Sequence, residues 1–277
     1  MRIPRKALLI SAFLFVYLLP QTSPSQANQP PTHSCPPPQS PKAVTITTVI
    51  DGDTVILGDG KHLRLIGINT PELDHQQGRH QPLAQAARQQ LQQLLEAPGL
   101  QLQLGSQSKD RHGRLLGHLY LADGRNVEAE LLRQGLGFAL SIAPNLDLRH
   151  CHRQAEQQAR SERRGVWRLE TYRPKLVTEL NHTDGGFGLF RGRISRIGKL
   201  RRGHFIELDD KIFVAAQGQA SGWIQDNFVQ LQKNSWIEIR GWLSVRRLSK
   251  QQKTRGFLPF SLKLNHSDGL ILCKNRC

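Results

Sequence analysis

The sequence predicts an α+β fold in which a small β-barrel is flanked by helices, and three observations lead to it. First, β-branched runs bounded by turn residues indicate short strands, of which Val44–Ile50 is the clearest. Second, apolar residues at helical spacing over Pro82–Leu95 indicate a helix, which Pro98 and Gly99 end. Third, the order along the chain is three strands, a helix, two strands and then helices. That order is typical of an OB-type barrel with flanking helices.

The elements of this barrel span residues 43–172. Asp59-Gly60 is a hairpin turn signal between the second and third strands. Two later helices are expected, one capped by Asn126 and ending near Gly135, the other running from about His150 to Arg164. After the first strand, the predicted strands are Thr54–Leu57, His62–Ile68, Leu100–Leu104 and Leu115–Leu121.

A second unit is predicted over residues 185–277. It repeats the order of three strands, a helix at 219–232 and two strands, so we expect a second small OB-like barrel. The predicted strands are Leu189–Ile197, His204–Leu208, Ile212–Ala215, Trp236–Val245 and Phe257–Leu264.

The first 42 residues carry no core-forming pattern. Residues 1–27 have a basic start, an apolar run at 7–19 and a small-residue exit at Ser25–Ala27, which are the features of a signal peptide. The apolar run is shorter than the roughly 20 residues of a spanning helix. We therefore expect a periplasmic or secreted protein without stable membrane insertion. The sequence leaves its oligomeric state open, and a monomer is the favoured expectation. Residues 28–42 are Pro-rich and are expected to form a linker.

The chain is strongly basic, with 38 Lys and Arg against 22 Asp and Glu and a formal net charge of +16. Such a surface attracts polyanions by long-range steering and counterion release. Nucleic acid, anionic lipid and anionic glycan all satisfy this electrostatic preference. Charge alone therefore does not identify the substrate.

Four cysteines follow the predicted signal peptide: Cys35, Cys151, Cys273 and Cys277. An even number in an exported protein favours disulfides, and four cysteines leave three connectivities open. His150-Cys151-His152 resembles a metal tract, but neighbouring helical residues point in different directions and no second Cys/His pair lies nearby. A disulfide is therefore the preferred interpretation of Cys151.

Three polar motifs lie at predicted strand ends or turns. They are Asp51-Gly52-Asp53-Thr54, Arg64-Leu65-Ile66-Gly67-Ile68-Asn69-Thr70-Pro71-Glu72 and Asp110-Arg111-His112-Gly113-Arg114. Each alone is explained by turn chemistry. Their combination in one barrel is what favours a function.

Together the motifs supply what cleavage of a phosphodiester requires. Asp53, Asn69 and a backbone carbonyl are hard oxygen donors that suit calcium or magnesium. Arg64 and Arg114 offer fork geometry to a phosphate and stay charged at any working pH. Glu72 is a carboxylate placed to orient or deprotonate a water.

The three motifs, in this order and at these intervals, resemble the staphylococcal nuclease (thermonuclease) family. The similarity runs from about Val44 to Trp167 and includes Gly165-Val166-Trp167. It implies an OB-barrel endonuclease that binds calcium and hydrolyses DNA or RNA. On that resemblance the expected calcium ligands are Asp53, Asn69 and the carbonyl of Thr70, and the expected catalytic residues are Arg64, Arg114 and Glu72.

The sequence departs from the family pattern at two places. Asn69 stands where the founding member has an aspartate, which removes one negative charge and predicts weaker calcium binding. His112 and Phe138–Ala143 stand where that member has tyrosines, so contacts to the nucleic-acid bases are expected to differ.

The second predicted barrel is a candidate nucleic-acid interface. OB-folds bind oligonucleotides with a sheet face and the loops between strands one and two and between strands four and five. Here those loops are Gly198–Gly203 and Arg246–Arg255, and both are basic. Phe205, Trp242 and Phe257 either stack on bases or fill the barrel. The basic candidates are Arg201, Arg202, Arg246, Arg247 and Lys250.

Two rival functions remain open at this stage. A degenerate nuclease barrel that only binds nucleic acid would be expected to lack Glu72 or one of the paired arginines, and all three are present. A cell-envelope protein that binds anionic polymers would need no Glu72. Both rivals predict binding without turnover.

Overall fold

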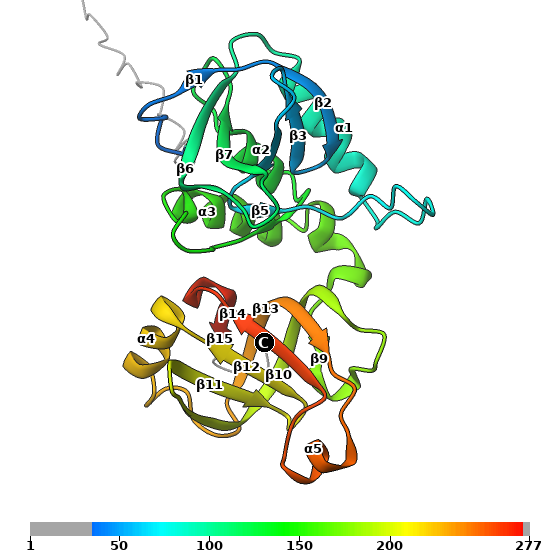
Figure 1. Cartoon of the computed structure of the whole chain (residues 1–277), viewed down its shortest axis with the longest axis vertical. Coiled ribbons are helices and arrows are strands. Elements are labelled where there is room, and N and C mark those ends of the chain that lie inside the picture. Colours follow the sequence, from blue (N-terminus) through cyan, green and yellow to red (C-terminus); the bar gives the residue numbers. More distant parts are fainter. Residues whose placement is uncertain (1–34, 274–277) are drawn as a thin grey trace, which may run out of the picture. The chain divides into compact units, whose positions relative to one another are not determined.

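The computed structural model describes residues 35–273, and the first part of this range forms a curled six-stranded sheet (Figure 1). The strand order is β1-β6-β7-β4-β3-β2, with β4 and β7 parallel and the other pairs antiparallel. β1 and β2 are consecutive along the chain and lie at the two ends of this order, so the sheet curls into a half-barrel. The strands are β1 (Lys42–Ala43), β2 (Ile46–Asp51), β3 (Thr54–Leu57), β4 (His62–Leu65), β6 (Gln101–Lys109) and β7 (Leu115–Tyr120).

Helices and one short strand pair complete this first barrel. α1 (Ala84–Leu95) buries Ala87 and Leu91 in the barrel core. α2 (Val127–Arg133) begins as predicted, because the Asn126 side chain accepts a hydrogen bond from the Ala129 N–H at 2.9 Å. The third helix is α3 (Arg149–Ser161), and the short pair joins β5 (Ile68–Asn69) to β8 (Phe138–Ala139).

The second barrel has the same strand order as the first and confirms the predicted OB-like unit. β10 pairs with β11 and β13, β11 with β12, and β13 with β14, all antiparallel, while β12 and β14 are parallel. These pairings form a closed ring of five strands. They are β10 (Gly186–Leu200), β11 (Gly203–Leu208), β12 (Ile212–Ala216), β13 (Trp236–Val245) and β14 (Phe260–Leu264), with β9 (Lys175–Leu176) and β15 (Leu270–Leu272) at the edges.

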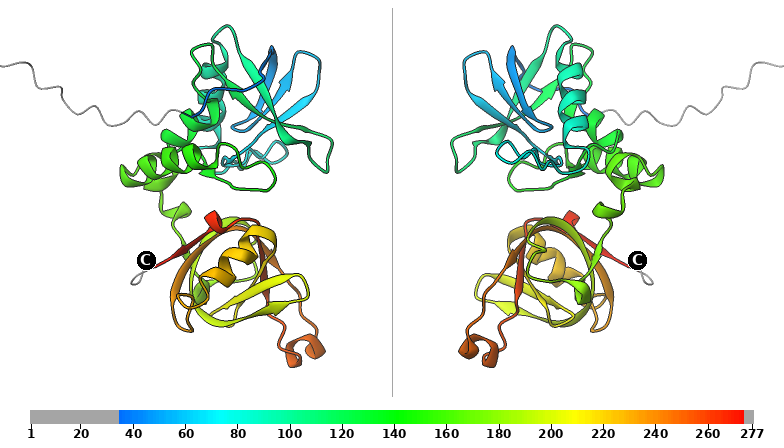
Figure 2. Two further views of the ribbon diagram at one scale, coloured as in Figure 1. Left: turned by 90° about the vertical axis from the view of Figure 1, so that its left-hand side faces the viewer. Right: turned by 90° about the vertical axis from the view of Figure 1, so that its right-hand side faces the viewer.

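The second barrel differs from the prediction in its connections. The expected helix at 219–232 is shorter, α4 (Gly218–Asp226), and β14 begins three residues after the predicted Phe257. α5 (Lys250–Thr254) lies inside the predicted basic loop and was not expected. It forms because Ser249 and Gln252 make a capping box. Figure 2 shows α5 at the tip of the connection that projects from the second barrel.

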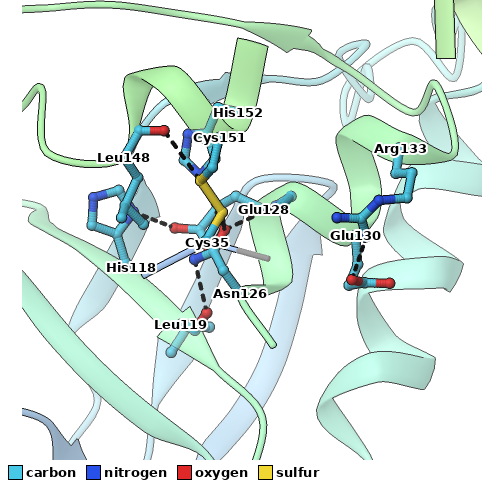
Figure 3. The surroundings of a disulfide bond; sticks show 11 residues. Cys35, His118, Leu119, Asn126, Glu128, Glu130, Arg133, Leu148, Cys151 and His152 are labelled. Atoms are coloured by element: carbon cyan, nitrogen blue, oxygen red, sulfur yellow. Dashed lines mark hydrogen bonds and ion pairs between the residues drawn. A yellow bond between two sulfur atoms is a disulfide. The ribbon is translucent and has the colours of Figure 1, made fainter. Parts of the chain in front are cut away.

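A disulfide between Cys35 and Cys151 joins the start of the described chain to α3, with the Cα atoms 5.3 Å apart (Figure 3). The sequence predicted a disulfide for Cys151 but not its partner. Residues 35–42 are correspondingly not a free linker: Cys35 is buried in the core and Lys42 pairs with Leu102. The bond and the added strand hold this Pro-rich segment on the barrel.

The His-Cys-His tract contributes its cysteine to a disulfide. Both Cys35 and Cys151 sulfurs are consumed by the disulfide, which leaves His152 as the one ligand of a possible cluster. His152 is buried, and its Nε2 lies 3.0 Å from Asn126 Oδ1. Burial and the neighbouring His118 hold the pKa of His152 well below its ordinary value. His152 is therefore a neutral core residue.

The two barrels share a set of contacts within one compact unit of residues 33–277. Arg240 of β13 donates to Glu156 of α3 at 2.7 Å and to the carbonyl oxygen of Ala139 at 3.1 Å. The rings of Phe138 and Phe187, one from each barrel, lie 5.3 Å apart. Buried charge and aromatic packing thus connect β8, next to β5, with the second barrel.

Within residues 35–273, no helix combines the length and apolar character needed to cross a membrane. The predicted signal peptide at 1–27 and the first part of the predicted linker lie outside the described residues.

Candidate active site

The acidic part of the site is the turn between β2 and β3. Asp51 ends β2, and the Asp53 N–H donates to Asp51 Oδ1 at 3.1 Å. Gly52 lets this turn approach the next element, since a Cβ there would lie 2.6 Å from the Ala87 Cβ and 2.8 Å from Thr70 Oγ1. A glycine is therefore required for both aspartates to reach the barrel mouth.

Asp53 is buried and holds the second motif against the first. Its Oδ2 accepts the Thr70 N–H at 2.9 Å, and its Oδ1 accepts the Thr54 hydroxyl at 3.1 Å. Asn69 is also buried and lies across from Phe138 in the β5–β8 pair. The three predicted oxygen ligands thus come from the β2–β3 turn and from β5 with the residue after it.

Arg64 lies among these oxygens. Its Nη2 is 2.8 Å from Asp53 Oδ2 and 3.3 Å from Asn69 Oδ1. Its Nη1 donates to the carbonyl oxygens of Leu65 and Ile68 at 2.7 and 2.9 Å. These contacts use the four N–H groups of Nη1 and Nη2, which leaves Nε–H for a further acceptor. Arg64 therefore fixes the two expected ligands in place.

Arg114 presents a second guanidinium group from the turn before β7. Its Nε donates to Asp110 Oδ2 at 2.8 Å, and its backbone N–H donates to Asp110 Oδ1 at 3.0 Å. Burial raises the pKa of Asp110, but the hydrogen bonds from Arg114 and His112 outweigh it and leave the pKa lowered. Because the ion pair uses Nε, the two Nη groups of Arg114 remain for an anion.

Glu72 is the last residue of the second motif and is exposed. Its backbone is pinned at both ends, as its N–H donates to Gln81 Oε1 at 2.9 Å and its carbonyl accepts the Gln81 N–H at 3.0 Å. Desolvation and the Asp53 charge raise the pKa of Glu72, against the opposing charges of Arg64 and Arg114. The Glu72 carboxylate is therefore influenced by the charges of Asp53, Arg64 and Arg114.

The carboxylates create a strongly negative centre. Desolvation and the charges of Asp53 and Glu72 raise the pKa of Asp51 to about 7. A carboxylate that resists ionisation at neutral pH marks a place where a cation would be stabilised. Asp51 was part of the first predicted motif but was not among the predicted ligands.

Two further residues of the site were not predicted from the sequence. Asp110 was noted only as part of a turn, although its place four residues before Arg114 was a usable signal. Gln81, nine residues from Glu72 in an irregular segment, carried no signal of its own. Asp110 positions Arg114, and Gln81 positions Glu72.

A pH prediction follows from Asp51. In chelator, Asp51→Asn is expected to raise the melting temperature at pH 8 by several degrees, and by less than half as much at pH 5. A raised pKa means that the group contributes stability below its ordinary pKa of 3.8 and loses it as the pH rises through about 7. Thermal unfolding at both pH values measures this, and an equal effect at pH 5 and pH 8 would contradict it.

Two grooves adjoin these residues. Arg64, Asp110 and Arg114 line one of about 700 Å³. Asn69, Thr70 and Glu72 line another of about 390 Å³, together with Gln81. Both volumes lie within the range of about 300–1,000 Å³ for ligand sites. The fold and this cluster define an OB-fold protein with a carboxylate–guanidinium site at the barrel mouth.

Comparisons with known proteins agree with this class. The model of the family described as staphylococcal nuclease homologue matches residues 62–169. Thermonuclease of Staphylococcus hyicus is 34% identical over 126 residues, 44% of this chain and 73% of that protein. Thermonuclease of Staphylococcus intermedius is 31% identical over 125 residues, 44% of this chain and 74% of that protein. The chain belongs to the staphylococcal nuclease homologue family.

Other relatives extend beyond the shared region. Endonuclease YncB of Bacillus subtilis (strain 168) is 32% identical over 134 residues, 47% of this chain and 63% of that protein. For the SPbeta prophage-derived endonuclease YokF of the same organism, the chain spans 45% of its length at 31% identity. The similarity to these two thus covers less than two thirds of either protein.

Proposed function

We propose that the chain is an exported, calcium-dependent nuclease that hydrolyses phosphodiester bonds of DNA or RNA. The observation that carries this proposal is the cluster in which Arg64 contacts Asp53 and Asn69 and Asp53 accepts the Thr70 N–H, two residues before Glu72. Arg114 lines the same groove as Arg64. Membership of the family and the names thermonuclease and endonuclease among its relatives support it. Export rests on the sequence of residues 1–27.

The donors present fit a hard divalent cation. The side-chain oxygens of Asp53 and Asn69 and the carbonyl of Thr70 supply ligands of the kind that calcium prefers. The raised pKa of Asp51 reflects negative charge that a cation would relieve. Bound there, the cation would neutralise charge on the phosphate.

The chain's own residues supply the remaining chemistry. Glu72, whose pKa is raised by desolvation and by the Asp53 charge, takes a proton from the attacking water. Arg114 offers two Nη groups to the phosphate oxygens, and Arg64 offers Nε–H while it holds Asp53 and Asn69. The guanidinium groups of Arg64 and Arg114 are held in place and would stabilise the negative charge that develops on the phosphate.

Cleavage by the purified chain tests the proposal. Supercoiled plasmid and a single-stranded RNA are incubated with the protein in calcium, and a chelator is then added. The proposal expects degradation that the chelator stops and that excess calcium restores. Tight binding without any cleavage would instead favour the non-catalytic nucleic-acid-binding function.

Asn69→Asp is expected to lower the calcium concentration needed for half-maximal cleavage by about tenfold. The substitution restores a carboxylate among the cation ligands, and ligand charge is a main determinant of calcium affinity. Calcium titrations of the cleavage rate compare wild type and variant. An unchanged or higher calcium requirement in Asn69→Asp would contradict the expectation.

We also propose that the basic loops of the second barrel bind nucleic acid. Arg201 and Arg202 are exposed at the β10–β11 turn, and Arg247 and Lys250 are exposed in the β13–β14 connection, beside the half-buried Arg246. The predicted loop Gly198–Gly203 is shorter in the structure. Gly198–Leu200 belong to β10, which leaves only the tight turn between β10 and β11.

Replacing these five residues by alanine is expected to weaken binding of single-stranded DNA in chelator and to reduce its salt dependence. Replacement of the four arginines by lysine is the matched control, because it keeps the charge. Fluorescence anisotropy over a salt series measures both. Equal affinity and salt slope for the alanine variant and wild type would exclude this role.

A further inference from the structure

Trp242 is a large aromatic side chain that the second barrel leaves exposed. It lies on β13, and 43% of its surface is accessible. Its backbone neighbours Gly241 and Leu243 are buried, so the ring projects from the sheet while the strand is fixed. The ring of Phe187, its cross-strand partner on β10, lies 5.1 Å away and supports one side of it.

A row of aromatic rings connects Trp242 to the candidate active site. Phe187 packs on Phe138 with the ring centroids 5.3 Å apart. Phe138 in turn is the cross-strand partner of Asn69 in the β5–β8 pair. The position of Trp242 relative to the predicted calcium ligands is therefore set by direct packing and by one strand pair.

Trp242 also shares a groove with the arginines. The groove of about 700 Å³ that Arg64 and Arg114 line is also lined by Trp242 and Lys263 of the second barrel. Lys263 is exposed on β14. The groove thus has two guanidinium groups at the reaction centre and an aromatic ring with an ammonium group in its wall.

This combination matches the chemistry of a single nucleic-acid strand. Proteins that bind single strands combine basic grooves, which follow the phosphates, with aromatic side chains on which bases stack. In a duplex the base faces are covered by neighbouring base pairs, so a lone exposed ring has no face to contact. A flat apolar ring between two basic positions therefore favours an unpaired base over a duplex.

We propose that Trp242 is a specificity-determining residue that stacks on an unpaired base adjacent to the scissile phosphate, with Lys263 contacting the next phosphate. The proposal rests on the proposed nuclease function for its reaction centre. It gives the second barrel a direct part in substrate binding. Single strands are then the preferred substrates.

Trp242→Ala tests the stacking role through the split between KM and kcat. On an octamer of thymidylate, the KM is expected to rise about tenfold while kcat stays near wild type, because one base stack is lost. Trp242→Phe is expected to recover part of the loss. Phe228→Ala, at another exposed aromatic of the second barrel (54% accessible), is the control and is expected to leave the KM unchanged.

A second substrate separates stacking from a structural effect. An octamer built from a stable abasic analogue keeps the phosphates and lacks the bases, so Trp242→Ala is expected to leave its KM unchanged. A similar rise in KM for both octamers, or no rise for either, would overturn the proposal.

Binding in chelator separates this inference from the proposed function. Anisotropy of a labelled thymidylate octamer needs no turnover and is expected to show the same tenfold loss of affinity in Trp242→Ala. Loss of binding without any wild-type cleavage would sink the nuclease proposal and keep the stacking site. If wild type cleaves the octamer but Trp242→Ala binds it with unchanged affinity, the stacking proposal fails and the nuclease proposal stands.

Discussion

Replacing Glu72 by glutamine is expected to lower kcat for nucleic-acid cleavage by about 10²–10⁴-fold, the usual contribution of a positioned general base. The amide has nearly the same shape, and the two backbone hydrogen bonds to Gln81 do not involve the Glu72 side chain. Folding and substrate binding should therefore persist. The loss is expected in kcat, with the KM for the octamer within about threefold of wild type.

The pH profile gives an independent readout of the same residue. Because partial desolvation and the charge of Asp53 raise the pKa of Glu72, wild-type activity is expected to fall on the acid side as that carboxylate becomes protonated. The residual activity of Glu72→Gln should not show this fall at acid pH. Glu96→Gln, at an exposed position after α1, is the matched control and is expected to keep wild-type activity. Full activity in Glu72→Gln would show that Glu72 is not the general base.

The fold was predicted best where local patterns carry the information. Thr54–Leu57 and Trp236–Val245 have the predicted bounds, because β-branched and aromatic residues are enriched in these segments. α2 begins at the predicted cap because Asn126 satisfies a free backbone N–H. Such signals are local and need no tertiary context.

The parts that could not be predicted depend on distant partners. Residues 35–42 contain little apolar pattern, and their place on the barrel follows from a disulfide partner 116 residues away. Gln81 has no motif around it, and its role follows from the fold of the irregular segment after Glu72. The charges that join the barrels, such as Arg240 with Glu156, resemble ordinary surface residues in the sequence.

Arg240→Ala is expected to lower the free energy of unfolding by about 3–5 kcal/mol, the cost of leaving a buried charge without its partner. The side chains of Arg240 and Glu156 are 9% and 7% exposed. Burial alone would lower the pKa of Arg240, but the Glu156 carboxylate raises it on balance. Urea unfolding measures the loss, and a change below about 1 kcal/mol would contradict a buried role for the pair.

The double variant Arg240→Met, Glu156→Gln distinguishes the lost partner from lost packing. Removing both charges eliminates the unpaired carboxylate, and the amide oxygen of the introduced glutamine can still accept the Ala139 N–H that Glu156 accepts at 2.8 Å. Most of the stability is therefore expected to return.

Since Ala139 pairs with Ile68 beside Asn69, the single variant Arg240→Ala should also raise the calcium requirement of cleavage, and the double variant should reverse that increase. If the double variant recovered stability but kept the raised calcium requirement, the Arg240 side chain itself would be acting on the Asn69 strand, through the hydrogen bond it donates to the Ala139 carbonyl.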